Sequence, residues 1–367
     1  MTETIRVIWV ATPFKSVLYE SVAKHFPPNM ELKVVSAVLG YDGDIPLLRW
    51  FRRYRHGLWF VPNGDLFREM RDFQPDIVFT DYPGYPSWYA KLYAYLRGRR
   101  IPLIAWLLGE YWTEYHAFVR GLRLQDRWIG PVYLFTWMTG MNRADRLLTV
   151  CEWLQKRVVE RFPRKRVSVQ YQGVDPEPWL TDDGRYDFNH PAVGLLQDNN
   201  IQPKVMGLIR FSEVIRRMPD VNFYVAGGGP YTPLVEKAFS GLRNVRFLGR
   251  LPYPVGVKKF YKSCDVYVLA SGLDCCPTTV LEASLSSLPV VASRVGGIPE
   301  LVKEGETGYT IPNDRVNDWS ARIRNLLDDK KLASKIGAQG KEHVLANFTW
   351  QKQAQALASV FKEELIC

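Results

Sequence analysis

Residues Asp265–Glu300 read DVYVLASGLDCCPTTVLEASLSSLPVVASRVGGIPE, and they are the most informative segment of the sequence about the fold. It opens with an apolar run, continues through a loop and a helix-forming segment, and ends with a second apolar run and a glycine-rich turn. Apolar runs without alternation on either side of a helix are typical of parallel strands covered on both faces. Pro277 suits a helix entry, because its missing N–H group costs no hydrogen bond there. We therefore predict a strand, a loop, a helix that begins near Thr278, and a second strand.

The same order of strands and helices extends over both halves of the chain, which at 367 residues is too long for one ordinary hydrophobic core. Gly and Pro interrupt the pattern near Gln172–Pro178. We predict an α/β protein of two doubly wound, Rossmann-like domains that face a cleft. The expected strands are Ile5–Ala11, Leu32–Val38, Asp76–Thr80, Pro102–Leu108, Leu147–Val150, Ala192–Leu196, Val221–Ala226, Val245–Leu248, Asp265–Leu269 and Pro289–Ser293.

Composition excludes several classes of protein. With 47% hydrophobic and 23% charged residues the chain is not disordered. Five cysteines form no C-x-x-C pair, which argues against a disulfide framework and a cysteine zinc site. No two histidines have metal-ligand spacing, so we expect no metal and no cofactor. The sequence shows no signal peptide and no membrane-spanning run, and we expect a cytoplasmic protein.

The net charge of +10 is unevenly distributed. Residues 1–170 contain 25 Lys or Arg and 16 Asp or Glu, so nearly all of the excess lies in the first half. This asymmetry predicts an anionic partner there, with a nucleic acid, an anionic membrane surface and a phosphorylated substrate all open. A nucleic acid is the least favoured, since no nucleic-acid-binding module is recognisable.

The helix that begins near Thr278 is a candidate phosphate site. The first amides of a helix and its positive dipole end attract an anion. Asp274 lies on the loop before this helix and Glu282 about one turn inside it. A diphosphate at the helix start would therefore have a carboxylate near each of its two substituents. The alternative is an acidic loop residue and a solvated helix glutamate.

This stretch resembles the donor-binding signature of glycosyltransferase family 4, the retaining group 1 glycosyltransferases of the GT-B fold. Asp274-x7-Glu282 matches the family's acid pair, although the first acid of the family is normally Glu. Pro289–Ser293 and Gly296–Glu300 match the strand and glycine turn that follow. The resemblance implies an acceptor-binding domain over residues 1–172, a nucleotide-sugar-binding domain over 173–348, and a C-terminal helix over 349–367 that returns to the first domain.

The resemblance also implies roles for single residues. Asp274 would hold hydroxyls of the donor sugar, and Glu282 those of the ribose. Arg250 would lie beside the nucleobase, and Gly194 is the glycine that opens the donor site. The diphosphate would bind at the loop residues Cys276, Pro277, Thr278 and Thr279.

Two departures from the family pattern bear on the chemistry. The family places Arg after the first glycine of its second domain, where this chain has Leu195, and Lys204 is the best remaining cation for the diphosphate. A solvated surface lysine is the alternative for Lys204. The family's His near the reacting sugar is also missing, and Glu110 stands there as the candidate to bind acceptor or donor sugar. We expect Asp274, Lys204 and Glu110 to carry the catalysis.

A basic segment over residues 46–60 reads PLLRWFRRYRHGLWF. At helical spacing its aromatic residues fall on one side and its arginines on the other, as in an interfacial membrane helix. The alternative is that the aromatic side packs in the core and the arginines are merely solvated. The candidate membrane-interface residues are Arg49, Trp50, Arg52, Arg53 and Trp59.

Taken together, the sequence predicts a retaining, metal-independent glycosyltransferase. The donor would be a nucleotide-diphosphate sugar, and the acceptor a hydroxyl group, on a lipid-linked molecule or a glycan at the inner face of the cell membrane. Two alternatives stay open: a nucleotide-sugar-binding protein without turnover, which the Leu195 departure motivates, and a nucleotide-sugar epimerase on the same fold.

Overall fold

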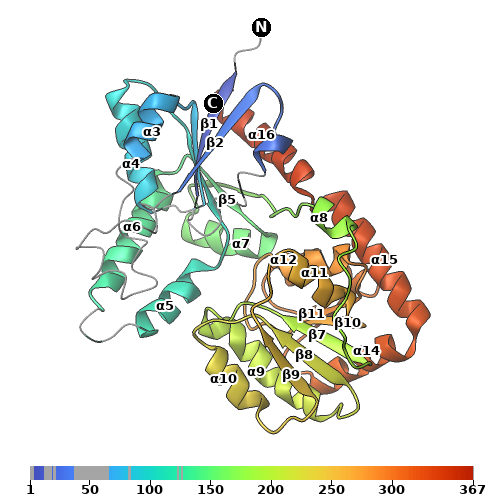
Figure 1. The fold of residues 1–367 in the computed structure, drawn as a ribbon. Coiled ribbons are helices and arrows are strands. Elements are labelled where there is room, and N and C mark those ends of the chain that lie inside the picture. Colours follow the sequence, from blue (N-terminus) through green and yellow to red (C-terminus); the bar gives the residue numbers. More distant parts are fainter. Residues whose placement is uncertain are drawn as a thin grey trace. The chain divides into compact units, whose positions relative to one another are not determined.

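The computed structural model describes residues 4–11, 19, 22–36, 66–81, 84–121, 124 and 127–366. The chain divides into two compact units, each with a six-stranded parallel sheet (Figure 1). The first unit comprises Met1–Leu108, Gly121–Tyr171 and Trp350–Cys367, and the second Gly109–Arg120 and Gln172–Thr349. Two parallel sheets with flanking helices confirm the predicted α/β class.

In the first unit the strand order is β2-β1-β3-β4-β5-β6, so the chain starts inside the sheet and builds outward in both directions. The central strands are buried along their whole length, as expected for a parallel sheet with helices on its faces. The strands are β1 (Ile5–Ala11), β2 (Met30–Ser36), β3 (Ile77–Thr80), β4 (Leu103–Leu107), β5 (Arg146–Thr149) and β6 (Arg166–Val169). The helical elements are η1 (Ala23–His25), α3 (Leu66–Phe73), α4 (Tyr85–Leu96), α6 (Ile129–Arg143), α7 (Glu152–Arg161) and α16 (Trp350–Ile366).

The C-terminal helix α16 belongs to the core of this first unit. Its Trp350 ring lies 6.3 Å from that of Trp106 on β4, and its Phe361 ring lies 5.3 Å from that of Phe79 on β3. Gln353 accepts a buried hydrogen bond of 2.8 Å from the Gln170 amide. The expectation that the last helix returns to the N-terminal domain is confirmed.

In the second unit the strand order is β12-β11-β10-β7-β8-β9. The order reverses between β7 and β10, and ligands of such sheets bind beyond the carboxyl ends of the strands at that point. The strands are β7 (Ala192–Leu196), β8 (Asn222–Ala226), β9 (Val245–Gly249), β10 (Val266–Leu269), β11 (Val290–Ser293) and β12 (Gly308–Ile311). The helices are α5 (Tyr111–Gly121), α8 (Glu177–Leu180), α9 (Gln202–Arg216), α10 (Thr232–Phe239), α11 (Val255–Lys262), α12 (Thr278–Leu285), α13 (Ile298–Leu301), α14 (Val316–Asp328) and α15 (Lys330–Asn347).

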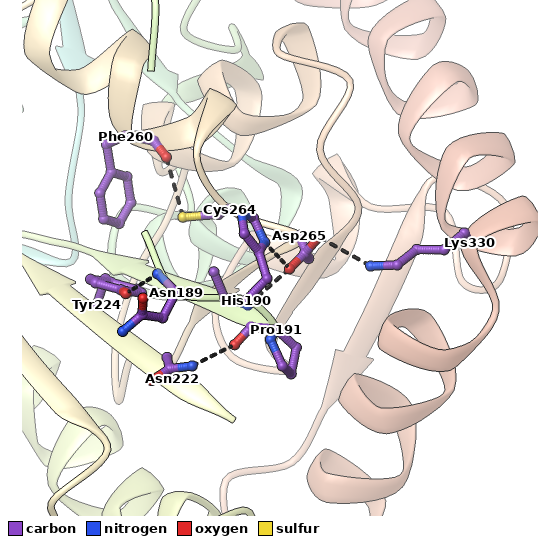
Figure 2. A network of polar contacts seen from close by, with 10 residues as sticks. Asn189, His190, Pro191, Asn222, Tyr224, Phe260, Cys264, Asp265 and Lys330 are labelled. Atoms are coloured by element: carbon purple, nitrogen blue, oxygen red, sulfur yellow. Dashed lines mark hydrogen bonds and ion pairs between the residues drawn. The ribbon is translucent and has the colours of Figure 1, made fainter. Parts of the chain in front are cut away.

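A polar network fixes the opposite, amino end of β7 and β10 (Figure 2). The Asp265 carboxylate, just before β10, accepts hydrogen bonds from the Ala192 amide at 2.8 Å and pairs with His190 Nδ1 at 2.7 Å. Its other oxygen pairs with Lys330 Nζ at 3.0 Å. One carboxylate thus ties together β7, β10 and the start of α15.

Candidate active site

The loop that leaves β10 lies against the first turn of α9. The Gly272 amide donates to the Lys204 carbonyl at 2.9 Å. A Cβ atom on Gly272 would lie 2.1 Å from the Pro203 carbonyl oxygen, and one on Gly207 would lie 2.3 Å from the Ser271 carbonyl carbon. Any side chain at these two glycines would separate loop and helix, so the glycines bring Lys204 to the carboxyl edge of the sheet.

Lys204 and Asp274 meet at this edge. Lys204 Nζ lies 3.0 Å from Asp274 Oδ2, and the Cys275 amide donates to Asp274 Oδ1 at 3.1 Å. Burial, the largest single effect, would lower the pKa of Lys204, but the Asp274 carboxylate together with Glu114 and Cys275 outweighs it, and the net shift of this pKa is upward. Lys204 is therefore a fixed cation and not a solvated surface lysine.

Helix α12 begins directly after this ion pair. Pro277 is its N-cap residue, and no side chain caps the helix. The first amides of an α-helix have no partner within the helix, and they point along its positive dipole end. The start of α12 thus offers an anion the donors that the sequence predicts for the loop Cys276–Thr279.

The glycine-rich turn after β11 holds the same loop by its backbone. The Gly297 amide donates to the Asp274 carbonyl at 3.1 Å. Gly296 has a φ of +55°, and a Cβ atom there would lie 1.8 Å from that same carbonyl oxygen. Position 296 therefore requires glycine for two reasons. Its φ is positive, and a side chain there would clash with the loop.

Glu282 is buried inside α12 and faces tyrosines. The Tyr261 hydroxyl lies 3.4 Å from Glu282 Oε2 and 3.2 Å from the Thr279 carbonyl oxygen. Burial raises the pKa of Glu282 to about 7, against the opposing effect of hydrogen bonds from Tyr261 and Tyr253. The alternative of a solvated helix glutamate is therefore wrong, and Glu282 is a buried carboxyl group poised between its two protonation states near neutral pH.

Arg250 lies where the loops after β7, β8 and β9 meet. Its guanidinium donates to the Gly228 carbonyl at 3.0 Å, and its Nη1 lies 3.8 Å from Asp198 Oδ1. The Gly227 amide donates to the Gly249 carbonyl at 2.8 Å, which joins two of these loops directly. The predicted contact of Arg250 with a nucleobase stays a prediction, but the residue is at the carboxyl edge where such a contact is made.

Gly194 packs closely against a neighbouring helix. It lies inside β7, where a Cβ atom would be 2.5 Å from Cys264 Sγ and 2.8 Å from the Phe260 ring. Close packing between β7 and α11 therefore accounts for the absence of a side chain here, and the predicted contact of Gly194 with the donor stays a prediction. The next residue, Leu195, is 1% exposed and packs in the core between the sheet and its helices.

Glu110 is buried at the start of α5. Its Oε2 accepts a hydrogen bond of 2.8 Å from the Thr113 amide, so the carboxylate caps this helix. A role in binding the acceptor or donor sugar stays a prediction. The candidate membrane-interface residues Arg49, Trp50, Arg52, Arg53 and Trp59 lie outside the described residues.

The described part of the chain has neither a metal-binding cluster nor a membrane-spanning helix. No group of three or more His, Cys, Asp or Glu side chains there is arranged to hold a metal ion. No helix there has the length and apolar character needed to cross a bilayer.

Sequence reasoning missed the side chains that support this edge. The Tyr267 hydroxyl donates to the Leu196 carbonyl at 2.8 Å and so fixes the end of β7. Asn313 accepts from the Ser293 hydroxyl at 2.6 Å and donates to the Ser271 carbonyl at 2.9 Å. A tyrosine in an otherwise apolar strand signals a buried hydroxyl that needs a partner, and Tyr267 carried that signal.

Comparison with known proteins gave matches over both units. A sequence model described as Glycosyltransferase Family 4 matches residues 5–178, and one described as Glycosyl transferases group 1 matches residues 193–329. Sulfoquinovosyl transferase SQD2 of Arabidopsis thaliana is 26% identical over 78% of this chain and 56% of its own. A GDP-mannose-dependent alpha-(1-6)-phosphatidylinositol monomannoside mannosyltransferase of Mycolicibacterium smegmatis is 31% identical over 60% of this chain and 62% of its own. The chain therefore spans less than two thirds of the length of either relative.

Solved structures share the fold at low sequence identity. The Anabaena protein HepE in complex with UDP-glucose superposes with a TM-score of 0.70 at 15% identity, over 98% of this chain and 100% of that one. Sucrose-phosphate synthase of Thermosynechococcus elongatus superposes with a TM-score of 0.69 at 15% identity, over 99% of both chains. These matches establish the GT-B fold.

Proposed function

The chain belongs to glycosyltransferase family 4, and we propose that it transfers a sugar from a nucleotide-diphosphate sugar to a hydroxyl acceptor. One observation carries the proposal. A fixed cation, Lys204, and a carboxylate, Asp274, meet 3.0 Å apart beside the uncapped start of α12, at the carboxyl edge of a doubly wound sheet. A diphosphate and the sugar attached to it need these groups together.

A nucleotide sugar is the donor that fits this edge. Lys204 and the first amides of α12 supply positive charge for the diphosphate, and Asp274 supplies oxygens for sugar hydroxyls. The HepE structure, a complex with UDP-glucose, supports a donor of this class at 15% identity. Arg250 beside Gly228 supports a base site at the neighbouring loops.

We propose that transfer proceeds with retention and without a metal ion. The bond between the sugar's anomeric carbon and the diphosphate oxygen breaks, and the acceptor oxygen bonds to the same face of that carbon. The acceptor proton passes to the departing phosphate oxygen. Lys204 and the α12 amides stabilise the charge that develops on the diphosphate, where single electrostatic contacts are typically worth about 2–4 kcal/mol.

The acceptor we propose is a lipid-linked molecule or a glycan at the inner face of the cell membrane. The excess of positive charge in residues 1–170 supports an anionic surface. The Mycolicibacterium smegmatis relative is named for phosphatidylinositol monomannoside, a lipid, which supports an acceptor of this kind.

A two-step experiment tests the proposal. Thermal shift across common nucleotide sugars identifies the donor, and release of nucleoside diphosphate is then measured with and without candidate hydroxyl acceptors. Transfer predicts release that depends on the acceptor and on Lys204. Binding without release would favour a protein without turnover, and conversion of the nucleotide sugar alone would favour an epimerase.

A further inference from the structure

Helices α4 and α6 of the first unit carry large apolar side chains that are exposed on the surface instead of being packed in the core. On each helix they recur at intervals of three and four residues, so they form one stripe along it. We call these two stripes the α4–α6 face. Its members are Trp88, Leu92, Tyr95 and Leu96 on α4, and Trp128, Val132 and Phe135 at the start and middle of α6.

The two stripes form one continuous surface. Helices α4 and α6 pack side by side (Figure 1), and the Trp88 ring centroid lies 6.2 Å from that of Phe135. Trp88 Nε1 also donates to the Thr139 hydroxyl at 3.2 Å. Tyr95 is 82% exposed, Phe135 60% and Trp128 54%. At about 200 Å² for a whole aromatic residue, the rings expose on the order of 400 Å², as much as the largest apolar patch of a typical soluble monomer.

The charged residues of the two segments that carry this face all have one sign. Residues 84–100 and 127–143 contain no Asp or Glu, and their cations are Lys91, Arg97, Arg99, Arg100, Arg127 and Arg143. Lys91 and Arg99 pair with aspartates outside these two segments. Arg100 and Arg127 are exposed, and among the residues that the structure describes neither has an ion-pair partner. The aromatic surface is therefore bordered by cations that are available to an anion.

We propose that the α4–α6 face docks this protein on an anionic lipid bilayer. Tyrosine and tryptophan side chains favour the boundary between headgroups and acyl chains, where ring and polar group are both accommodated. Arg100 and Arg127 would meet lipid phosphates. Apolar burial and electrostatic attraction then act together, as in monotopic membrane proteins.

Charge decides against a second copy as the occupant. A two-fold dimer through this face would bring the same cations of both copies together. Like charges opposed across an interface are unfavourable, and neither copy supplies an acidic residue from these segments to offset them. An anionic bilayer complements the unpaired cations Arg100 and Arg127.

Vesicle co-sedimentation of the full chain tests the proposal, with phosphatidylcholine vesicles that contain or lack phosphatidylglycerol. The aromatic variant is Tyr95→Ser with Phe135→Ser, and its control, Leu180→Ser with Leu234→Ser, removes exposed apolar side chains from the second unit. The charge variant is Arg100→Gln with Arg127→Gln, and its control is Lys331→Gln with Lys335→Gln, which removes the same charge from exposed positions of α15. Circular dichroism and Tm establish that each variant is folded.

We expect wild type to bind anionic vesicles and not neutral ones, with binding that weakens as salt rises. The charge variant should bind roughly 30-fold more weakly, from the usual attraction of two cations near an anionic surface. The aromatic variant should bind anionic vesicles at least tenfold more weakly than wild type, and both controls should bind like wild type.

Equal binding of the α4–α6 variants and wild type would overturn the proposal, as would the absence of wild-type binding to anionic vesicles at low salt. A dimer seen in sedimentation velocity for wild type but not for the aromatic variant would also overturn it, because this result would assign the face to self-association. The inference deepens the membrane-surface part of the proposed function. Vesicle binding needs neither donor nor acceptor, so its failure leaves the transfer activity standing, and loss of transfer leaves docking standing.

Discussion

Strand β10 has an aspartate at each end, and the two carboxylates are surrounded in opposite ways. Asp265, at the amino end, is engaged by His190, the Ala192 amide and Lys330, and its pKa is lowered because these hydrogen bonds outweigh burial. Asp274, at the carboxyl end, pairs with Lys204 and the amide of its own neighbour. The amino-end group ties elements together (Figure 2), whereas the carboxyl-end group lies beside helix amides that no side chain caps. A carboxylate–lysine pair by itself therefore does not indicate a functional site. The edge of the sheet on which the pair lies, and the groups around it, distinguish the functional pair from the structural one.

The largest contrast should come from removing the lysine at each end. Lys204→Ala should lower kcat/KM by about 10²–10³, since it removes one electrostatic contact to the departing diphosphate. Lys330→Ala should leave kcat/KM within about twofold of wild type, because Lys330 lies at the amino edge. Release of nucleoside diphosphate measures both. An equal loss of kcat/KM in the two variants would contradict the distinction between the two ends of β10.

The second contrast concerns pH and the buried Glu282. Its pKa of about 7 in the folded chain exceeds its ordinary value of 4.5. Below pH 4.5 the carboxyl is protonated in both states. Between pH 4.5 and 7 the unfolded chain loses a proton that the folded chain keeps, so the free energy of unfolding should fall by about 3 kcal/mol from this group and then level off. Urea unfolding across this range should show the fall in wild type and not in Glu282→Gln.

Donor affinity should rise with pH, whereas the free energy of unfolding falls. If ribose hydroxyls donate to the ionised Glu282 carboxylate, donor affinity rises with pH through about 7 and then levels off. Glu282→Gln should bind donor more weakly at pH 8 and without this rise. Calorimetry at several pH values measures it, and the same rise in the glutamine variant would assign the proton to another group.

The third contrast compares the two aspartates, of which one should affect stability alone and the other activity. Asp265→Ala should lower the free energy of unfolding by about 2 kcal/mol, because it leaves the Ala192 amide and two side chains without their acceptor. Its donor affinity should stay unchanged. Asp274→Ala should lower kcat/KM and donor affinity, in addition to a loss of stability from leaving the largely buried Lys204 without its carboxylate. Urea unfolding and donor titration of both variants would show a reversed pattern if the assignment of the two ends is mistaken.

The smallest effect is expected for the stability of Lys330→Ala. The Lys330 side chain is 65% exposed, and an ion pair of this kind contributes about 0–1 kcal/mol. The change in unfolding free energy should lie below 1 kcal/mol in physiological salt and vanish in 1 M salt. A larger or salt-independent loss would mean that Lys330 contributes through packing.

Most strands could be predicted because parallel strands covered on both faces are continuous apolar runs. Ile5–Ala11 and Ala192–Leu196 have the predicted bounds. The sheet-edge strands β6 and β12 were not predicted. Arg166–Val169 alternates polar and apolar residues, and Gly308–Ile311 begins with glycine, so neither presents an apolar run.

The site could be predicted where it depends on chain order, and not where it depends on distant contacts. The loop between β10 and α12 follows from Pro277 and the neighbouring acid. The Lys204 contact joins residues seventy positions apart and is made by the glycines that allow α9 to approach, which no local pattern reveals. The same kind of close packing, against α11, explains the glycine at position 194, and it too joins residues far apart in the sequence.

The most direct test of the account is a crystal structure with UDP or GDP, whichever raises the Tm more. Phosphate oxygens should lie within hydrogen-bond distance of the backbone amides of Thr278 and Thr279, with Lys204 Nζ turned from Asp274 toward the same phosphate. A nucleotide bound elsewhere, with the start of α12 in contact with solvent alone, would contradict it.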